Sequence, residues 1–505
     1  MISIHTTHRF TCVLVGLVGV LVALSAAAPA ALAHRPPPPA GSGGSTQAQT
    51  PIHTIVTNGG RGAPRPVRPR QASPVRHVVV IYLENHSFDN VLGFWCDANP
   101  GRCPQGGMPA SVTLSNGAVV SPSVTHDTVP AVQHTVASQV AAMDAGKMDG
   151  WQNIPDGSCD AATGYRCISG YQPAQLPNLI GLAQHFAISD NTFSLNDSES
   201  WASHIAIVSA SQDHFYGDNP PSHRFPPASG WGCESGREAL WIKPQSTSRL
   251  LVPSCVPDHS LNPVHYPYGG AFERTPVGYI PTIMDRLQAA GLSWRIYGAP
   301  KGAKGYGIWD ICPTFAECLD TSQDANLVPD AQFLTDARDG TLPAFSVVTP
   351  GGPDFLHACH NGMSMTACDN WAGQLAAAVM NGPDWSSTAV FITFDDCGCF
   401  YDQVPPPVDP AGAQEGPRVP LIIVSPYARP GYTDTQATTF AGILAYTEHT
   451  FGLAPLGVND AQAYDFSNAF NYSQRPLKRV PMVHRPLPAS ARRIRVTPAL
   501  AHDPT

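Results

Sequence analysis

The sequence predicts an α/β fold, a three-layer α/β/α sandwich around a mainly parallel sheet. Three continuous apolar runs rich in β-branched residues are typical of strands buried on both faces: His77–Leu83, Thr388–Phe394 and Val419–Val424. Helical stretches lie between these runs, including Ile280–Ala290 and Asn370–Met380. Strands that alternate with helices indicate a parallel sheet with helices on both of its faces.

A late helix and two chain segments of different composition complete the predicted organisation. Ala437–Phe451 has the apolar spacing of a helix near the end of the main domain, which spans residues 77–474. Residues 34–76 form a linker rich in Pro, Gly and Arg without a hydrophobic period, a composition typical of disorder. Residues 475–505 form a basic tail, again rich in Pro and Arg and without an apolar pattern.

Residues 1–33 have the layout of a secretory signal peptide. An apolar run from Cys12 to Ala28 follows Arg9, and Ala31-Leu32-Ala33 supplies small residues at a cleavage site. The run is about 17 residues long, shorter than the ~20 that a spanning helix requires, which favours cleavage over membrane anchoring. We therefore expect a secreted protein, extracellular or associated with the cell envelope.

The distribution of charge excludes the ordinary kind of nucleic-acid binder. The 505 residues include 29 Lys plus Arg and 38 Asp plus Glu, a net charge of −9. Both ends are basic, so the main domain holds 15 basic and 37 acidic residues, and 15 − 37 gives −22. A domain of this charge repels polyanions over most of its surface, and no nucleic-acid partner is expected.

The cysteines agree with export. Apart from Cys12 there are twelve, an even number, and they follow one another at short spacings that suggest local disulfides. Cys397 and Cys399 flank one residue, so either they form a strained bridge or each pairs elsewhere. The order of the others suggests Cys96–Cys103, Cys159–Cys167, Cys233–Cys255, Cys312–Cys318 and Cys359–Cys368.

Polar residues follow two of the three buried runs. Glu84-Asn85 comes directly after Leu83, and Asp395-Asp396 comes directly after Phe394. Open α/β sheets place their sites at the carboxyl ends of strands, and three carboxylates with an amide suit a divalent cation of unknown identity. Either pair alone would fit a helix cap or a turn. Together they favour a metal site formed by Glu84, Asn85, Asp395 and Asp396.

Several motifs in order resemble those of a known family. Glu84 to Asp89 (ENHSFD) resembles the E-N-x-S-F-D signature of bacterial phosphoesterases of the phospholipase C and acid phosphatase group, whose fold is alkaline-phosphatase-like. The resemblance covers most of residues 77–474 and implies metal-dependent hydrolysis of phosphate esters. The further matching segments are GKMDGW at 146–151, GLSWRIY at 291–297, FDDCGCFYD at 394–402 and GPRVP at 416–420.

The same resemblance implies a serine nucleophile. The family's D-N-x-F matches Asp190–Phe193, and the family spacing of ten residues from that Asp places Ser200 at the nucleophile position and His204 at its H/R position. Ser198 remains an alternative, because the expected Pro-Asn between nucleophile and His is Ala202-Ser203 here. A helix entering after this loop would favour an anionic phosphate at its N-terminus, although Ser is also a common helix cap.

Two histidines complete the predicted catalytic set. His134 precedes the GKMDGW segment as a His does in the family, and His360 matches the His that precedes the last sheet strand, with His357 as an alternative. A neutral imidazole can stabilise phosphoryl charge or protonate a leaving oxygen. The expected catalytic residues are therefore Ser200, His134 and His360.

The expected function is that of a secreted metal-dependent phosphoesterase. Its substrate would be a phosphate ester, either a phospholipase C-type phosphodiester or a phosphomonoester. A low-turnover metal- or phospholipid-binding protein on the same scaffold is the alternative, prompted by Gln403 where the family has His. A sulfatase-like hydrolase is a third reading, but the sulfatase pattern of Cys or Ser followed by x-P-x-R is not found.

Two features bear on the partners. Five tryptophans could include a cage for a quaternary ammonium group, although such residues more often belong to a core. The basic tail suits peripheral contact with an anionic membrane surface as well as it suits disorder. The tryptophans concerned are Trp95, Trp151, Trp201, Trp231 and Trp294.

Overall fold

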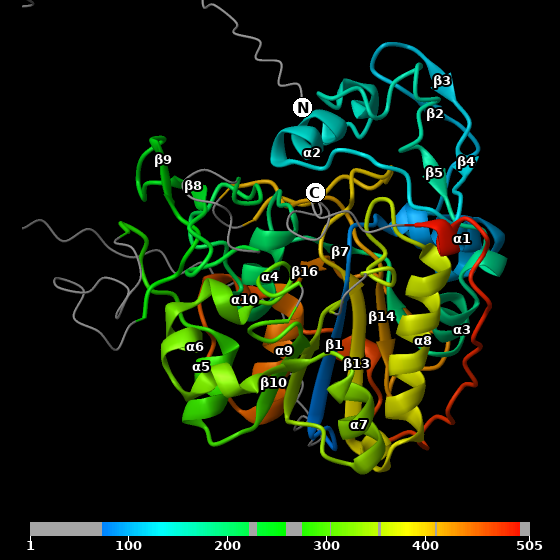
Figure 1. The fold of residues 1–505 in the computed structure, drawn as a ribbon. Helices are drawn as coiled ribbons and strands as arrows, with labels where there is room; N and C mark the ends of the chain where they lie inside the picture. The colour runs from blue at the N-terminus through cyan, green and yellow to red at the C-terminus, as the bar shows by residue number, and fades with distance from the viewer. Residues whose placement is uncertain are drawn as a thin grey trace, which may run out of the picture. The chain divides into compact units, whose positions relative to one another are not determined.

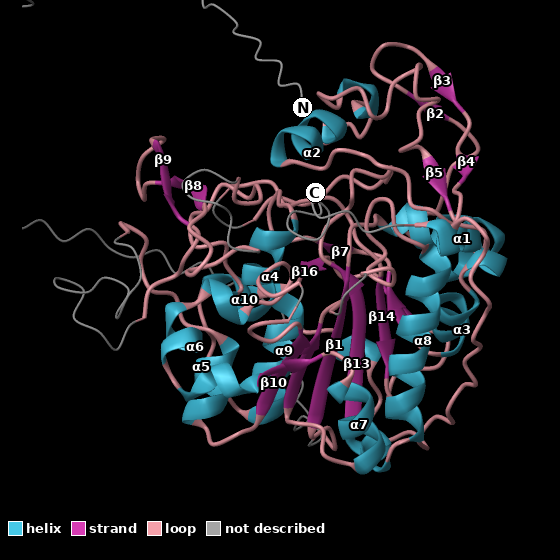
Figure 2. Cartoon of the chain, in the orientation of Figure 1, coloured by secondary structure: helices cyan, strands magenta, loops and turns pink. Residues whose placement is uncertain are grey.

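An eight-stranded sheet runs through the middle of the fold, with helices on both faces (Figures 1 and 2). This confirms the predicted fold class. Its strand order is β11-β10-β12-β1-β13-β14-β6-β15, and β14 alone runs against the other strands. The strands are β1 (His77–Leu83), β6 (Ala187–Ser189), β10 (Trp294–Gly298), β11 (Leu327–Pro329), β12 (Phe345–Val348), β13 (Thr388–Phe394), β14 (Leu421–Val424) and β15 (Thr433–Asp434).

The computed structural model describes the greater part of the main domain. The predicted signal peptide and nearly all of the predicted linker lie outside the described residues, as do residues 495–505 of the predicted tail. No helix in the described part is long and apolar enough to cross a membrane. The described residues are 73–221, 230–258, 275–303, 305–351, 355–409 and 412–494.

Two helical layers cover the sheet. Helices α3, α7 and α8 pack on one face, where α8 contacts β13 and α3 contacts β14 and β6. Helices α4, α5 and α9 pack on the other face, where the Tyr446 ring of α9 meets Phe391 of β13 at 5.1 Å. The helices are α1 (Phe94–Ala98), α2 (Val136–Met143), α3 (Pro177–His185), α4 (Ser200–Ser209), α5 (Ile283–Ala289), α6 (Ala316–Asp320), α7 (Gln332–Asp339), α8 (Met365–Asn381), α9 (Ala441–Phe451) and α10 (Val458–Gln462).

The predicted elements occur close to their expected positions. The predicted helix at 370–380 is the middle of α8, which begins earlier because the Ser364 side chain caps it by accepting from the Ala367 N–H. The predicted helix at 437–451 begins at Ala441, since Thr438–Thr439 forms the short strand β16 instead. β14 is reversed because the chain returns from β13 without a crossover helix, and a parallel pairing requires a crossover.

Short strands outside the main sheet hold the connecting segments. The pairs β2–β3 and β4–β5 lie together with α2 beyond the end of the sheet where β1 leads into α1, at the top of Figure 2. The pair β8–β9 forms a separate hairpin. These strands are β2 (Val112–Thr113), β3 (Val119–Val120), β4 (Ser123–Val124), β5 (Ser169–Gly170), β7 (Thr192–Phe193), β8 (Glu238–Ile242), β9 (Arg249–Pro253) and β16 (Thr438–Thr439).

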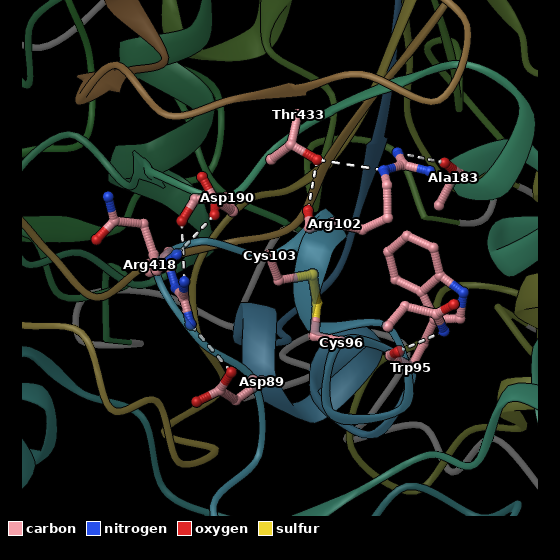
Figure 3. The surroundings of a disulfide bond; sticks show 12 residues. Asp89, Trp95, Cys96, Arg102, Cys103, Ala183, Asp190, Arg418 and Thr433 are labelled. Carbon is pink, nitrogen blue, oxygen red and sulfur yellow. Dashed lines mark hydrogen bonds and ion pairs between the residues drawn. A yellow bond between two sulfur atoms is a disulfide. The ribbon is translucent and has the colours of Figure 1, made fainter.

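All five disulfides predicted from the order of the cysteines are present, and Cys397 and Cys399 are unpaired and buried. Figure 3 shows the surroundings of Cys96–Cys103, with an arginine on either side of it in that view. Arg102 donates to the Ala183 carbonyl at 2.9 Å and stacks over Trp95. The disulfide therefore lies among contacts that join the start of the domain to later segments.

The first part of the predicted tail, residues 475–494, is an extended strap along α3 and α8, drawn in red in Figure 1. Two side-chain amides hold this segment by hydrogen bonds to both the N–H and the carbonyl of one of its residues, as a neighbouring β-strand would. Asn178 of α3 both donates to the Val483 carbonyl and accepts from its N–H, and Asn370 of α8 does the same for Arg485. Each amide uses both of its polar atoms, so the strap is anchored at two points along the helices.

Asp213, just after α4, makes the stability of the fold depend on pH. It is 4% exposed, its Oδ2 has no hydrogen-bond partner among the described residues, and burial raises its pKa to about 8. The folded protein thus keeps a proton that an unfolded Asp, with a pKa of about 3.9, has released. The free energy of unfolding should therefore fall as the pH rises from about 4 to about 8.

Asp213→Asn is expected to remove the part of this dependence that Asp213 contributes. Asn carries no charge and tolerates the left-handed backbone found here, where φ is 48°. The melting temperature of the variant should equal that of the wild type near pH 4 and exceed it increasingly up to pH 8. Thermal unfolding at several pH values checks this, and a difference that stays constant with pH would contradict it.

Candidate active site

The site is built where two neighbouring parallel strands end. Leu83 of β1 is in register with Phe394 of β13, so the polar residues that follow each strand lie side by side. Glu84, Asn85, Asp395 and Asp396 are all essentially buried, at 0 or 1% exposed. The first turn of α4 meets them and brings Ser200 into the same cluster.

Asn85 ties the two strand ends together. Its backbone N–H donates to Asp395 Oδ1 at 2.8 Å, and its side-chain amide donates to Asp396 Oδ2 at 2.8 Å. The same amide donates to Ser200 Oγ at 3.2 Å, which leaves the Asn85 Oδ1 without a partner in the described part. Its backbone is left-handed, with φ at 47°, a conformation that Asn tolerates better than most residues.

Ser200 and Ser198 occupy different surroundings. The Ser200 hydroxyl donates to Glu84 Oε2 at 3.0 Å while accepting from Asn85. The Ser198 hydroxyl instead pairs with the Ser203 hydroxyl at 2.6 Å. Of the two serines left open by the sequence, the structure places Ser200 against the predicted metal ligands.

His204, one turn along α4, also faces the cluster. Its Nδ1 lies 2.8 Å from the Trp309 carbonyl, an acceptor, so Nδ1 carries the ring proton. Burial lowers the pKa of His204 to about 4, and in the neutral ring Nε2 then offers a lone pair. That lone pair faces Glu84 Oε1 at 3.1 Å, a contact between two acceptors that requires a proton or a cation between them.

The cluster fits a divalent cation. Glu84, His204 and Asp395 each offer a ligand atom, and these atoms lie within 4.8 Å of one another. Asp395 Oδ2 has no hydrogen-bond partner within the residues described, and burial together with neighbouring carboxylates, Asp395 first, raises the pKa of Glu84 and of Asp396. Crowded buried carboxylates with free oxygens are stabilised by a bound positive charge, and the oxygen and imidazole donors suit several divalent metals.

His134 and His360 lie next to each other beside this cluster. Their ring centroids are 5.7 Å apart, and burial lowers the pKa of both, that of His360 to about 3. His134 Nδ1 contacts the Val132 carbonyl, whereas its Nε2 and both nitrogens of His360 have no partner in the described ranges. His357, the alternative to His360, is directed elsewhere and contacts Asp330 at 3.5 Å.

Comparison with known proteins identifies the family to which this chain belongs. The profile of the Phosphoesterase family matches residues 75–454, which is most of the chain. The chain belongs to the phosphoesterase family. This confirms the family predicted from the motifs, and it supports the predicted class of enzyme, a hydrolase acting on phosphate esters.

Curated relatives of this phosphoesterase carry the name phospholipase C. The non-hemolytic phospholipase C of Pseudomonas aeruginosa is 22% identical over 79% of this chain and 57% of that protein. The non-specific phospholipase C1 of Arabidopsis thaliana is 23% identical over 71% of this chain and 62% of that protein. This phosphoesterase thus spans less than two thirds of both. Phospholipase C B of Mycobacterium tuberculosis is 24% identical over 83% of this chain and 82% of that protein.

Solved structures resemble this phosphoesterase only distantly. A protein described as belonging to the alkaline phosphatase superfamily, from Vibrio parahaemolyticus, is 12% identical over 55% of this chain and 60% of that chain, with a TM-score of 0.29. Ps i-CgsB is 10% identical over 78% of this chain and 76% of that chain, with a TM-score of 0.36. The assignment of the fold therefore rests on the observed sheet and its helical layers.

A cavity of about 300 Å³ lies beside the site of this phosphoesterase. His134 lines it, and so does Glu199, the residue directly before Ser200. Glu199 is 5% exposed, and its Oε2 accepts from the Asn219 N–H at 2.6 Å. The other lining residues are Ala131, Val132, Gln133, Thr135, Asp156 and Asn361.

The loop after β13 packs closely against the end of β1 in this phosphoesterase. A Cβ at Gly398 would lie 2.3 Å from the Asn85 carbonyl oxygen, so only glycine fits against the other strand end. Gly398 donates to Asp396 Oδ1 at 2.6 Å, and Cys399 donates to Cys397 Sγ at 3.1 Å. The loop thus fixes the position of Asp396.

Two functional candidates in this phosphoesterase were missed by sequence reasoning. The spacing of the family motif placed His204 at its H/R position but assigned it no role. Nothing in the sequence indicated Glu199 except its place before Ser200. Gln403, by contrast, donates to the Gly107 carbonyl and has no contact with the carboxylate cluster. The five tryptophans considered for a cage are buried, none more than 3% exposed, and none lines the cavity.

Proposed function

We propose that the protein is a secreted metal-dependent phosphoesterase that hydrolyses phosphate esters through Ser200. One observation carries the proposal: the Ser200 hydroxyl lies 3.0 Å from Glu84 Oε2, at the start of α4 and inside a cluster of unsatisfied metal-type donors. A helix N-terminus favours an anionic phosphoryl group at this position. The names of the phospholipase C relatives support a phosphodiester or phosphomonoester as the substrate.

Glu84, Asn85, Asp395 and Asp396 would hold the metal, with His204 as a further ligand. The divalent ion supplies a positive charge that lowers the pKa of a neighbouring hydroxyl and stabilises phosphoryl oxygens. The ligands come from three elements, the ends of β1 and β13 and the helix α4. Their mutual hydrogen bonds hold them in place before any substrate arrives.

The first chemical step joins Ser200 to phosphorus. Ser200 Oγ forms the new P–O bond as the bond to the alcohol breaks. The hydroxyl proton passes to Glu84 Oε2, which already accepts its hydrogen bond, and ends on the oxygen of the leaving alcohol. His134 Nδ1 contacts the Val132 carbonyl, so in the neutral ring Nε2 carries the lone pair. Nε2 lacks another partner in the described part and is placed to accept a hydrogen bond from the attacking water. Water then attacks the phosphoserine, releasing phosphate or a phosphomonoester and restoring the hydroxyl.

Export is supported by the disulfides and by the signal-like N-terminus. Five disulfides in a protein of this size are typical of an oxidising compartment. Contact of the basic C-terminal residues with an anionic membrane surface belongs to the same proposal.

Metal removal tests the proposal. Dialysis against EDTA is expected to lower the hydrolysis of p-nitrophenyl phosphate and p-nitrophenyl phosphorylcholine by at least about 100-fold, because no other group in the cluster supplies positive charge to the phosphoryl oxygens. One equivalent of the correct divalent ion should restore the rate. Metal content by mass spectrometry and p-nitrophenol release are the measurements.

A matched pair of variants controls this experiment. Asp395→Asn removes a ligand charge and should lose both the metal and the activity, whereas Asp339→Asn changes a carboxylate on the exposed end of α7 and should lose neither. Full activity in verified metal-free protein would overturn the metal requirement. Bound metal without turnover of either substrate would favour the low-turnover binding protein instead.

A further inference from the structure

We propose that Gln139 is a positioning residue for the second chemical step, in which water attacks the phosphoserine. The proposal rests on the proposed function, because it concerns how His134 is held relative to Ser200. Gln139 belongs to α2, beyond the end of the sheet, and is fully buried. Its side chain joins the segment that carries His134 to the loop that carries Ser200.

The Gln139 side chain binds the backbone of two segments with both of its polar atoms. Its Nε2 donates to the His134 carbonyl at 2.9 Å and to the Ser198 carbonyl at 2.6 Å. Its Oε1 accepts from the Ser198 N–H at 3.3 Å. Buried polar groups are nearly always hydrogen-bonded, because an unpaired one costs free energy. An apolar side chain at this position would therefore take a partner from three buried backbone groups at once.

His134 depends on this attachment because it lies two residues before α2 begins. The Asn361 amide ties the same segment to the loop of His360, by donating to the Val132 carbonyl at 2.9 Å. The two histidines are thereby linked to each other, and their rings lie 5.7 Å apart. Gln139 then fixes the distance of this pair from the nucleophile loop.

Ser200, in contrast, is held by the strand ends. Its hydroxyl donates to Glu84 Oε2 at 3.0 Å and accepts from the Asn85 amide at 3.2 Å. Gln139 contacts the backbone of Ser198, two residues earlier, and makes no bond to the Ser200 hydroxyl. Loss of the Gln139 amide should therefore displace His134 relative to Ser200 and leave the hydroxyl against Glu84.

The second step requires both groups at a fixed separation. The water oxygen bonds to phosphorus as the bond from phosphorus to Ser200 Oγ breaks. His134 Nε2, which has no partner within the described residues, takes a proton from the water, and that proton ends on Ser200 Oγ. A misplacement of about 1 Å can lower such a rate about 100-fold. The first step uses Glu84 as the proton acceptor, so it depends much less on where His134 lies.

Gln139→Met tests the proposal, since Met has nearly the length of Gln and no amide. We expect the metal-loaded full-length variant to release about one equivalent of p-nitrophenol rapidly from p-nitrophenyl phosphorylcholine. It should then turn over about 100-fold more slowly than the wild type. Mass spectrometry of the quenched protein should find the phosphoryl group accumulated on Ser200. The Val136 N–H still bonds Asp218 at 2.8 Å, which keeps α2 attached in the variant.

The control is Gln323→Met, which changes another buried glutamine. Gln323 is 2% exposed and donates to Asp285 of α5 at 3.0 Å. Its loss should lower the melting temperature, change kcat less than about twofold and leave no phosphoserine. Gln139→Asn is a milder second variant, because its amide is one methylene too short to reach both segments. It should also accumulate phosphoserine, even if Gln139→Met does not fold.

Wild-type turnover in folded Gln139→Met or Gln139→Asn would overturn the proposal. A loss of rate without accumulated phosphoserine would make Gln139 a general support of the site and would overturn it as well. Accumulation in Gln323→Met to the same extent would show that any loss of stability has this effect, and would again contradict the proposal. A wild type that releases no p-nitrophenol, or Ser200→Ala with an unchanged rate, would instead overturn the proposed function.

Discussion

Ser200→Ala is expected to lower the rate of phosphate release at least about 10³-fold, because it removes the atom that attacks phosphorus. The change deletes one buried oxygen that bonds Glu84 and Asn85, so the fold and metal binding should persist. Hydrolysis of p-nitrophenyl phosphorylcholine by metal-loaded protein measures the loss. Metal content and the melting temperature of the same sample show that the site is otherwise intact.

Ser198→Ala is the matched control. It removes a hydroxyl of the same kind two residues away, which pairs with the Ser203 hydroxyl, and should keep the rate within about tenfold of the wild type. If Ser198→Ala abolished turnover while Ser200→Ala retained it, the assignment of the nucleophile would be wrong. Loss of turnover in both variants with normal metal binding would show that the two serines depend on each other through the start of α4.

Arg418→Met is expected to lower the free energy of unfolding by about 3–5 kcal/mol. Arg418 is fully buried and donates to Asp89 Oδ1 at 2.9 Å and to both oxygens of Asp402 at 3.0 and 3.1 Å. It also donates to the Asp190 carbonyl at 2.9 Å (Figure 3). Its guanidinium stacks over Phe88. Two buried carboxylates would lose their only cationic partner in the described part of the chain.

Urea-induced unfolding of wild type and variant measures this effect. Arg479→Met is the control, since Arg479 is exposed and donates to the Asn381 side chain at 2.7 Å. It should change the free energy of unfolding by less than about 0.5 kcal/mol. Combining Arg418→Met with Asp402→Asn should recover part of the loss, because it removes one of the stranded charges. No recovery would mean that the lost packing over Phe88 outweighs the ion pairs.

The sequence predicted three strands of the central sheet because their signals are local. A run such as Val78–Leu83 is apolar at every position, which only a strand covered on both faces tolerates. Parallel neighbours end at the same edge, so the order of residues along the chain is enough to place Glu84 and Asp395 together. The five disulfides could also be predicted from the sequence, because each joins a cysteine to the next one along the chain.

Other features could not be predicted because they depend on where distant segments dock. His204 acquires its place beside Glu84 only through the orientation of α4, which the Trp309 carbonyl and the packing of Tyr82 help to fix. Glu199 reaches the cavity because the Asn219 N–H holds it there. The reversed direction of β14 and the strap held by Asn178 likewise leave no local pattern in the sequence.

The consecutive pairing of the cysteines also bears on how the chain is oxidised. The five bridges close loops of between 6 and 22 residues, and no bridge encloses another. A chain that meets an oxidant from its N-terminus onward would present each cysteine first to its native partner. Such a protein should reach its correct bridges with little help from an isomerase, whereas interleaved bridges would first need wrong pairs to be reshuffled. Cys397 and Cys399 come last in this order, after the ten cysteines of the five bridges have met their partners.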